Sequence, residues 1–61
     1  MKRYVLIKHL KKNNCKLLRE GKKHSVYYNT INKKTSSIPR HNEVGNNLVL
    51  KICKDLDINK P

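Results

Sequence analysis

The 61-residue sequence has few acidic residues, few aromatic side chains and no long apolar run. Only four Asp and Glu residues stand against fifteen Lys and Arg, which gives a formal net charge of +11. So few carboxylates argue against a nuclease that relies on two carboxylate-bound metal ions. The apolar run near the start, residues 4–7, is too short to be the core of a signal peptide. It is also far shorter than the about 18 residues that a membrane-spanning helix needs. We therefore expect no membrane segment and a cytoplasmic protein.

Cysteine is also scarce. Cys15 and Cys53 are far apart in the sequence and lie in no Cys-x-x-Cys motif. In a reducing cytosol we expect both to be small buried side chains. Structural zinc needs four ligands at suitable spacing, and two isolated cysteines with three isolated histidines do not provide that pattern. The sequence therefore predicts no metal site, and no motif in it indicates a cofactor.

The positive charge is concentrated in the first two thirds of the chain. Residues 1–40 contain twelve basic residues and one acidic residue, whereas residues 41–61 contain three of each. A field of this kind attracts polyanions, and each phosphate that it neutralises releases condensed counterions. Nucleic acid is therefore the predicted partner. The alternatives are that the charge only improves solubility or that it favours an anionic membrane surface, although no segment has the amphipathic pattern for the latter.

The order of apolar and polar residues predicts five short elements in a single domain, residues 1–61. Leu6, Ile7 and Leu10 form one stripe of a first helix, which we expect to end at residues 13–14, since asparagine tolerates the left-handed conformation. Three β-prone segments joined by short turns follow, and this indicates an antiparallel meander. The three segments are residues 15–20, 24–29 and 35–39.

A second helix is predicted near the C-terminus, with Asn46 or Asn47 as its N-cap and its end near Asp57. Its apolar face has the spacing i, i+3, i+4 and i+7. That face consists of Val49, Ile52, Cys53 and Leu56. Because a three-stranded sheet of this size needs one apolar face covered, we expect both helices to pack on one face. The predicted fold is a two-layer α+β domain of order α-β-β-β-α, with the other sheet face, or the edges and loops, open to a ligand.

The segment GKKHSVYYN, residues 21–29, contains the side chains best suited to chemistry. His24 follows two lysines, so a proton-transfer group and cations that can stabilise a charged phosphorane occur in one turn. Metal-free cleavage of RNA needs these two kinds of group. The alternative is a non-catalytic strand residue. His24 shares a face with Val26 and Tyr28 and is buried if that face is the core, although it begins its strand beside a turn.

Basic residues near the two turns are candidate contacts to RNA phosphates. The predicted RNA-binding residues are Lys22, Lys23, Lys33, Lys34, Arg40 and His41. His41 has two further interpretations, a second acid/base group and an ordinary loop residue after proline. His9 is explained as a solvated helix residue. Tyr27 and Tyr28 are able to stack on RNA bases, but aromatic residues in the middle strand of a small sheet are more often part of the core.

Four segments, spread over nearly the whole length of the chain, carry a resemblance to a known family. They are LIKHLKKN (6–13), GKKHSVYY (21–28), IPRHNE (38–43) and LVLKICKDLDI (48–58). They resemble the HicA toxins of bacterial type II toxin-antitoxin modules, small mRNA interferases whose fold is similar to the double-stranded RNA-binding domain. The resemblance implies that His24 matches the family's catalytic histidine. It also implies that messenger RNA is the substrate and that a HicB antitoxin masks the cleavage face.

The sequence therefore predicts a metal-independent endoribonuclease toxin that acts on single-stranded mRNA without a cofactor. His24 is the predicted general base, with electrostatic help from Lys22 and Lys23. Because the 2′-hydroxyl of RNA would be the nucleophile, the products should carry 2′,3′-cyclic phosphate ends. Two other hypotheses are consistent with the same amino-acid composition. One is a non-catalytic RNA-binding module of the double-stranded-RNA-binding type, and the other is a small adaptor for an acidic protein.

Overall fold

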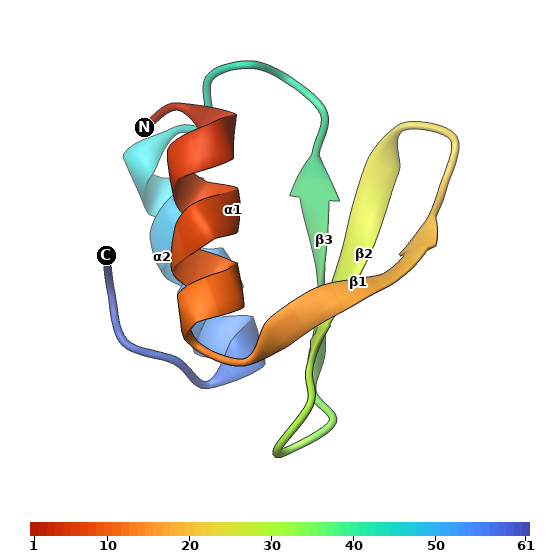
Figure 1. The fold of residues 1–61 in the computed structure, drawn as a ribbon. Coiled ribbons are helices and arrows are strands. Elements are labelled where there is room, and N and C mark those ends of the chain that lie inside the picture. Colours follow the sequence, from red (N-terminus) through yellow and green to blue (C-terminus); the bar gives the residue numbers. More distant parts are fainter.

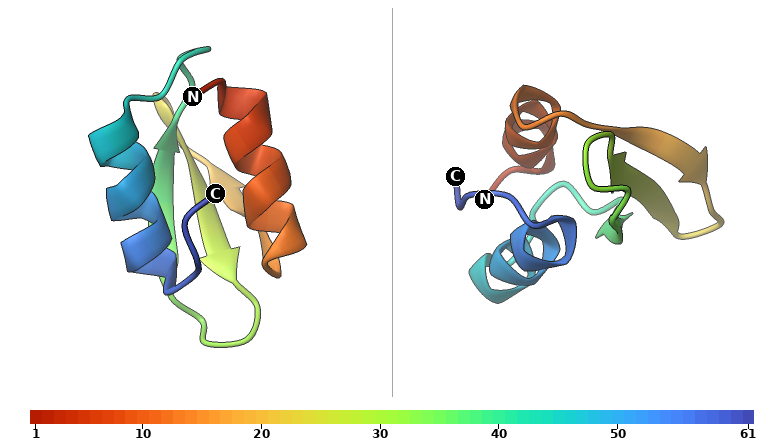
Figure 2. Two further views of the ribbon diagram at one scale, coloured as in Figure 1. Left: turned by 90° about the vertical axis from the view of Figure 1, so that its left-hand side faces the viewer. Right: turned by 90° about the horizontal axis from the view of Figure 1, so that it is seen from below.

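The computed structural model describes all 61 residues, and its five elements follow the predicted order (Figure 1). The elements are α1 (Arg3–Lys12), β1 (Cys15–Glu20), β2 (His24–Asn29), β3 (Thr35–Pro39) and α2 (Asn46–Leu56). The strands form one antiparallel sheet in the order β1-β2-β3. Both helices lie on the same side of this sheet (Figure 2), so the predicted two-layer α+β fold is confirmed. Neither helix is long and apolar enough to cross a membrane.

The residues that end α1 and begin α2 can be compared with the predicted ones. α1 ends as predicted, because Asn14 adopts a left-handed conformation with φ 68° after Asn13. The prediction that Asn46 or Asn47 caps α2 is wrong. Gly45 is the N-cap: its backbone is extended, and its carbonyl accepts the first intrahelical hydrogen bond, from Val49 N at 2.9 Å. Both asparagines are therefore already within the helix, where their side chains do not cap it.

The core lies between the helices and the sheet. Ten buried side chains form it, namely Leu6, Leu10, Cys15, Tyr27, Ile38, Val44, Val49, Ile52, Cys53 and Leu56. The predicted apolar face of α2 is thus entirely buried. Cys15 and Cys53 are free buried thiols, as expected, and burial raises the pKa of both. The two cysteines therefore act as small apolar side chains.

The two faces of β2 have opposite environments. Ser25, Tyr27 and Asn29 are buried toward the helices, whereas His24 is exposed and Tyr28 is half-buried on the other face. The core expectation is therefore confirmed for Tyr27 and wrong for Tyr28, since consecutive strand residues point to opposite faces. This alternation places His24 on the open face of the sheet.

β1 extends away from the helices after its first residue. Only Cys15 is buried in this strand. The register with β2 shifts between Leu17 and Arg19, which is the signature of a β-bulge. Figure 1 shows that the β1–β2 hairpin reaches beyond the helices into solvent. The turn that precedes His24 is therefore carried on a projecting arm, where a large ligand has access to it.

Candidate functional site

His24 is the first residue of β2 and follows the turn of residues 21–23. Its side chain is exposed and has no hydrogen-bond partner, so both ring nitrogens are available to a ligand. The backbone around it is tightly closed, because Gly21 N donates to His24 O at 2.7 Å. A Cβ atom on Gly21 would lie 3.1 Å from the same oxygen. Glycine thus allows the close approach that closes this turn.

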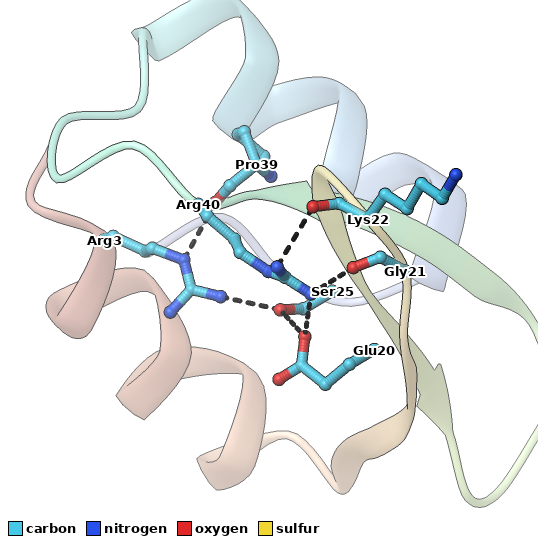
Figure 3. A network of polar contacts seen from close by, with 7 residues as sticks. All are labelled: Arg3, Glu20, Gly21, Lys22, Ser25, Pro39 and Arg40. Atoms are coloured by element: carbon cyan, nitrogen blue, oxygen red, sulfur yellow. Dashed lines mark hydrogen bonds and ion pairs between the residues drawn. The ribbon is translucent and has the colours of Figure 1, made fainter.

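A polar network holds the backbone on both sides of His24 (Figure 3). Arg3, from α1, donates from Nη2 to Ser25 Oγ at 3.0 Å and from Nε to Pro39 O at 2.8 Å. Ser25 Oγ in turn donates to Glu20 Oε1 at 2.6 Å. Ser25 directly follows His24, and Pro39 pairs with His24 across the sheet. The network therefore fixes both the residue after the histidine and the partner of the histidine on β3. Residues distant in sequence therefore set the position of His24.

Arg40 joins this network to the turn itself. Its Nη2 donates to Glu20 Oε1 at 2.9 Å and to Gly21 O, and its Nη1 donates to Lys22 O at 3.2 Å (Figure 3). These contacts use three of the five N–H donors of a guanidinium group, which leaves Nε–H and one Nη1–H free. Arg40 therefore fastens the turn and still has donors for a phosphate.

The electrostatics of the site favour an anionic ligand. The hydrogen bonds from Ser25 and then Arg40 lower the pKa of the Glu20 carboxyl, so this group is ionised at neutral pH and is already occupied by its partners. Lys22 and Lys23 are exposed and belong to no ion pair. The turn thus presents two unpaired ammonium groups beside the histidine. The nearby carboxylate, Glu20, is occupied by its hydrogen bonds with Ser25 and Arg40.

The predicted RNA-binding residues divide between the two ends of the sheet. Lys22, Lys23, Arg40 and His41 lie at the end where β2 begins, with His24. Lys33 and Lys34 lie in the β2–β3 turn at the opposite end, and β2 between them is about 17 Å long. Lys34 also lies near a carboxylate, with its Nζ 3.8 Å from Asp57 Oδ2. The structure therefore does not gather all the predicted residues around the histidine.

The other two histidines have different surroundings. His41 is exposed in the loop after Arg40, and its side chain makes no hydrogen bond. His9 is more than the solvated helix residue that was expected, because its Nε2–H donates to Asn59 O at 2.6 Å and so ties the C-terminal segment to α1. No group of three or more His, Cys, Asp or Glu side chains is arranged to hold a metal ion.

Three members of the site, Arg3, Glu20 and Ser25, were not predicted from the sequence. One signal for Glu20 was present, since it is the only acidic residue among the first forty. Arg3 had no comparable signal, because its contacts cross 22 and 36 residues of sequence.

The fold and site define a small basic α+β domain with an exposed histidine at the start of a strand, next to a lysine-bearing turn. A protein-family model described as the HicA toxin of bacterial toxin-antitoxin matches residues 5–58, which is most of the chain. The chain therefore belongs to the HicA toxin family, and membership of a toxin-antitoxin family implies an antitoxin partner. The searches of curated proteins and of solved structures found no match.

Proposed function

We propose that this protein is a metal-independent endoribonuclease that cleaves messenger RNA and is neutralised by a HicB-type antitoxin. The observation that carries the proposal is His24, an exposed imidazole without a partner beside a turn that bears two unpaired lysines. Its setting in a HicA-family chain supports the same function. The backbone on either side of the imidazole is held in place, which is the kind of preorganisation that catalysis on an open surface requires.

In the proposed reaction, His24 takes the proton from a ribose 2′-hydroxyl. The 2′-oxygen then attacks the adjacent phosphorus and forms a new P–O bond. The bond from phosphorus to the 5′-oxygen breaks, and that oxygen leaves with a proton from a general acid or from water. The products are a 2′,3′-cyclic phosphate and a 5′-hydroxyl. DNA lacks the 2′-hydroxyl and is not a substrate.

The cations near the turn have a separate role in this proposal. Lys22 and Lys23 stabilise the negative charge that builds up on the phosphorane oxygens. Arg40 offers its two free N–H groups to a neighbouring phosphate while its other contacts hold the turn. His41, in the next position, is the candidate for the acid that protonates the leaving 5′-oxygen. Each of these assignments uses a side chain at the same end of the sheet as His24.

Incubation with a single-stranded RNA in the presence of a chelator tests the proposal. We expect the wild-type protein to cut RNA but not DNA of the same sequence, and to leave 2′,3′-cyclic phosphate ends. His24→Ala should bind RNA as before but lose about 10²–10⁴-fold in rate, the range of a general base. His9→Gln is the matched histidine control, because His9 lies on α1 and binds the C-terminal segment.

Three results would contradict the proposal: cleavage that stops when metal is removed, equal cleavage of DNA, or full activity in His24→Ala. One observation favours a second candidate, a non-catalytic RNA-binding module: no side chain orients the His24 ring by a hydrogen bond. If the wild type and His24→Ala bind RNA equally and neither cuts it, this second function is the correct one. Reduced cleavage in His41→Ala with unchanged RNA affinity would identify the acid.

A further inference from the structure

The face of the sheet opposite the helices carries side chains that neither the core nor the polar network uses. His24, Val26 and Tyr28 of β2 point to this open face. On β1, Arg19 pairs with Val26 and Lys16 pairs with Tyr28, and directly paired residues share a face. On the other side of β2, the small exposed residues Ser37 and Thr35 pair with Val26 and Tyr28. We call these seven residues the open face.

The charge on the open face is positive only. Lys16 and Arg19 are both exposed, and neither belongs to an ion pair. All four carboxylate side chains are engaged elsewhere. Glu20 is in the polar network, Glu43 is at the N-terminal amine, Asp55 is paired with Lys51, and Asp57 is near Lys34. No acidic side chain on this face therefore repels a polyanion.

We propose that the open face binds single-stranded RNA along β2, with a base stacked on Tyr28 and with phosphates bound by Lys16 and Arg19. This inference rests on the proposed function, because it describes the path of the RNA toward His24. It also gives Lys33, in the turn at the far end of β2, a place on the same ligand, whereas Lys34 lies near Asp57 at the end of α2. The RNA then extends from the histidine at one end of the strand to Lys33 at the other.

The chemistry of this face favours single-stranded RNA over a duplex. A duplex hides the faces of its bases, whereas a single strand can lay an unstacked base on an aromatic ring. Tyr28 is half-buried, so part of its side chain remains accessible to a base. Its cross-strand neighbour Thr35 is small and leaves room for a base. Stacking tolerates every base, and so the contact adds affinity without a strong sequence preference.

Binding measurements in the His24→Ala chain test this surface without cleavage of the probe. The probe is a fluorescently labelled single-stranded oligouridine long enough to span β2. We expect Tyr28→Leu to weaken binding by roughly 5- to 150-fold, the range for loss of one stacked base. Tyr28→Phe keeps the ring and should bind nearly as well as the parent. The matched control is Tyr4→Leu, since Tyr4 is an exposed tyrosine on α1, on the other side of the sheet.

The two cations are tested by salt dependence. Lys16→Gln and Arg19→Gln should each reduce the slope of log affinity against log salt by about 0.7, the value for one phosphate contact on a single strand. Lys54→Gln, on α2, is the matched control and should leave the slope unchanged. Circular dichroism and thermal unfolding of every variant show that a loss of binding is not a loss of fold.

The proposal is overturned if folded Tyr28→Leu binds RNA as tightly as its parent, or if the α1 and α2 controls lose as much as the open-face variants. It is also overturned if these variants weaken binding only to an acidic protein partner and not to RNA. Failure of the proposed function gives a different pattern. Tyr28-dependent RNA binding without cleavage by the wild type refutes the catalytic role of His24 and leaves the surface intact. Undiminished cleavage by Tyr28→Leu refutes the surface alone.

Discussion

Asn29 fastens the far end of β2 to α2, and its replacement by alanine should cost stability that can be worked out from its contacts. The side chain is only 4% exposed, and its Nδ2 donates to Leu56 O at 3.0 Å. Its Oδ1 accepts from Ile31 N at 2.9 Å and, more weakly, from Asn32 N at 3.4 Å. Two good neutral hydrogen bonds are worth about 1 kcal/mol each, and the small space left by the amide adds to this. We therefore expect Asn29→Ala to lose about 2–3 kcal/mol.

For a domain of this size, that loss corresponds to a fall in Tm of roughly 10–20 °C. Thermal and urea unfolding followed by circular dichroism measure it, with an unchanged urea m-value as the sign that the folded and unfolded states remain comparable. Asn47→Ala is the control, because Asn47 is exposed on α2 and makes no side-chain hydrogen bond. It should stay within about 0.5 kcal/mol of the wild type. If Asn29→Ala is equally mild, Asn29 does not fasten α2 to the sheet and the reasoning is wrong.

Three further predictions concern the turn before His24. Gly21→Ala should lower stability by about 1 kcal/mol in urea unfolding, because the new Cβ meets His24 O at 3.1 Å; a stabilised variant would contradict this. Arg40→Gln should reduce RNA cleavage with little change in Tm, because it removes the donors that hold the carbonyls of Gly21 and Lys22. Arg40→Lys should not restore cleavage, because lysine lacks the planar fork of the guanidinium group. The depressed pKa of Glu20 contributes stability above its ordinary value of 4.5, and this is lost as the pH falls through the folded-state value. Glu20→Gln should therefore flatten the acid limb of stability measured from neutral pH to about pH 3.

The sequence predicted the elements and the core well because both depend on local periodicity. The face of α2, with its spacing of i, i+3, i+4 and i+7, is buried as expected. The orientation of β2 could not be predicted in the same way, since its buried face contains Ser25 and Asn29, and a hydropathy pattern does not distinguish these from exposed polar residues. Their burial depends on partners such as Arg3 and Leu56, which are 22 and 27 residues away.

The placement of the candidate site had the same limit. A histidine beside lysines was visible in the sequence, but the network that holds its backbone is made by contacts between α1, β1 and the segment after β3. Arg40 illustrates this limit. Its charge predicted a phosphate contact, whereas the structure adds three contacts within the site that no local pattern encodes. Long-range side-chain hydrogen bonds were therefore the part of the site that sequence reasoning could not supply.

The two buried polar residues of β2 explain how so small a domain can leave a whole sheet face free. A chain of 61 residues has a thin core, and a fully apolar buried face on β2 would be the simpler way to stabilise it. Instead, Ser25 and Asn29 use hydrogen bonds on the buried face to fix the two ends of the strand. The residues on the other face of the strand, His24 and Tyr28 among them, lie outside the buried core. Stability and ligand contact are thus divided between the two faces of one strand, so substitutions on the open face should change RNA binding or cleavage with little change in Tm.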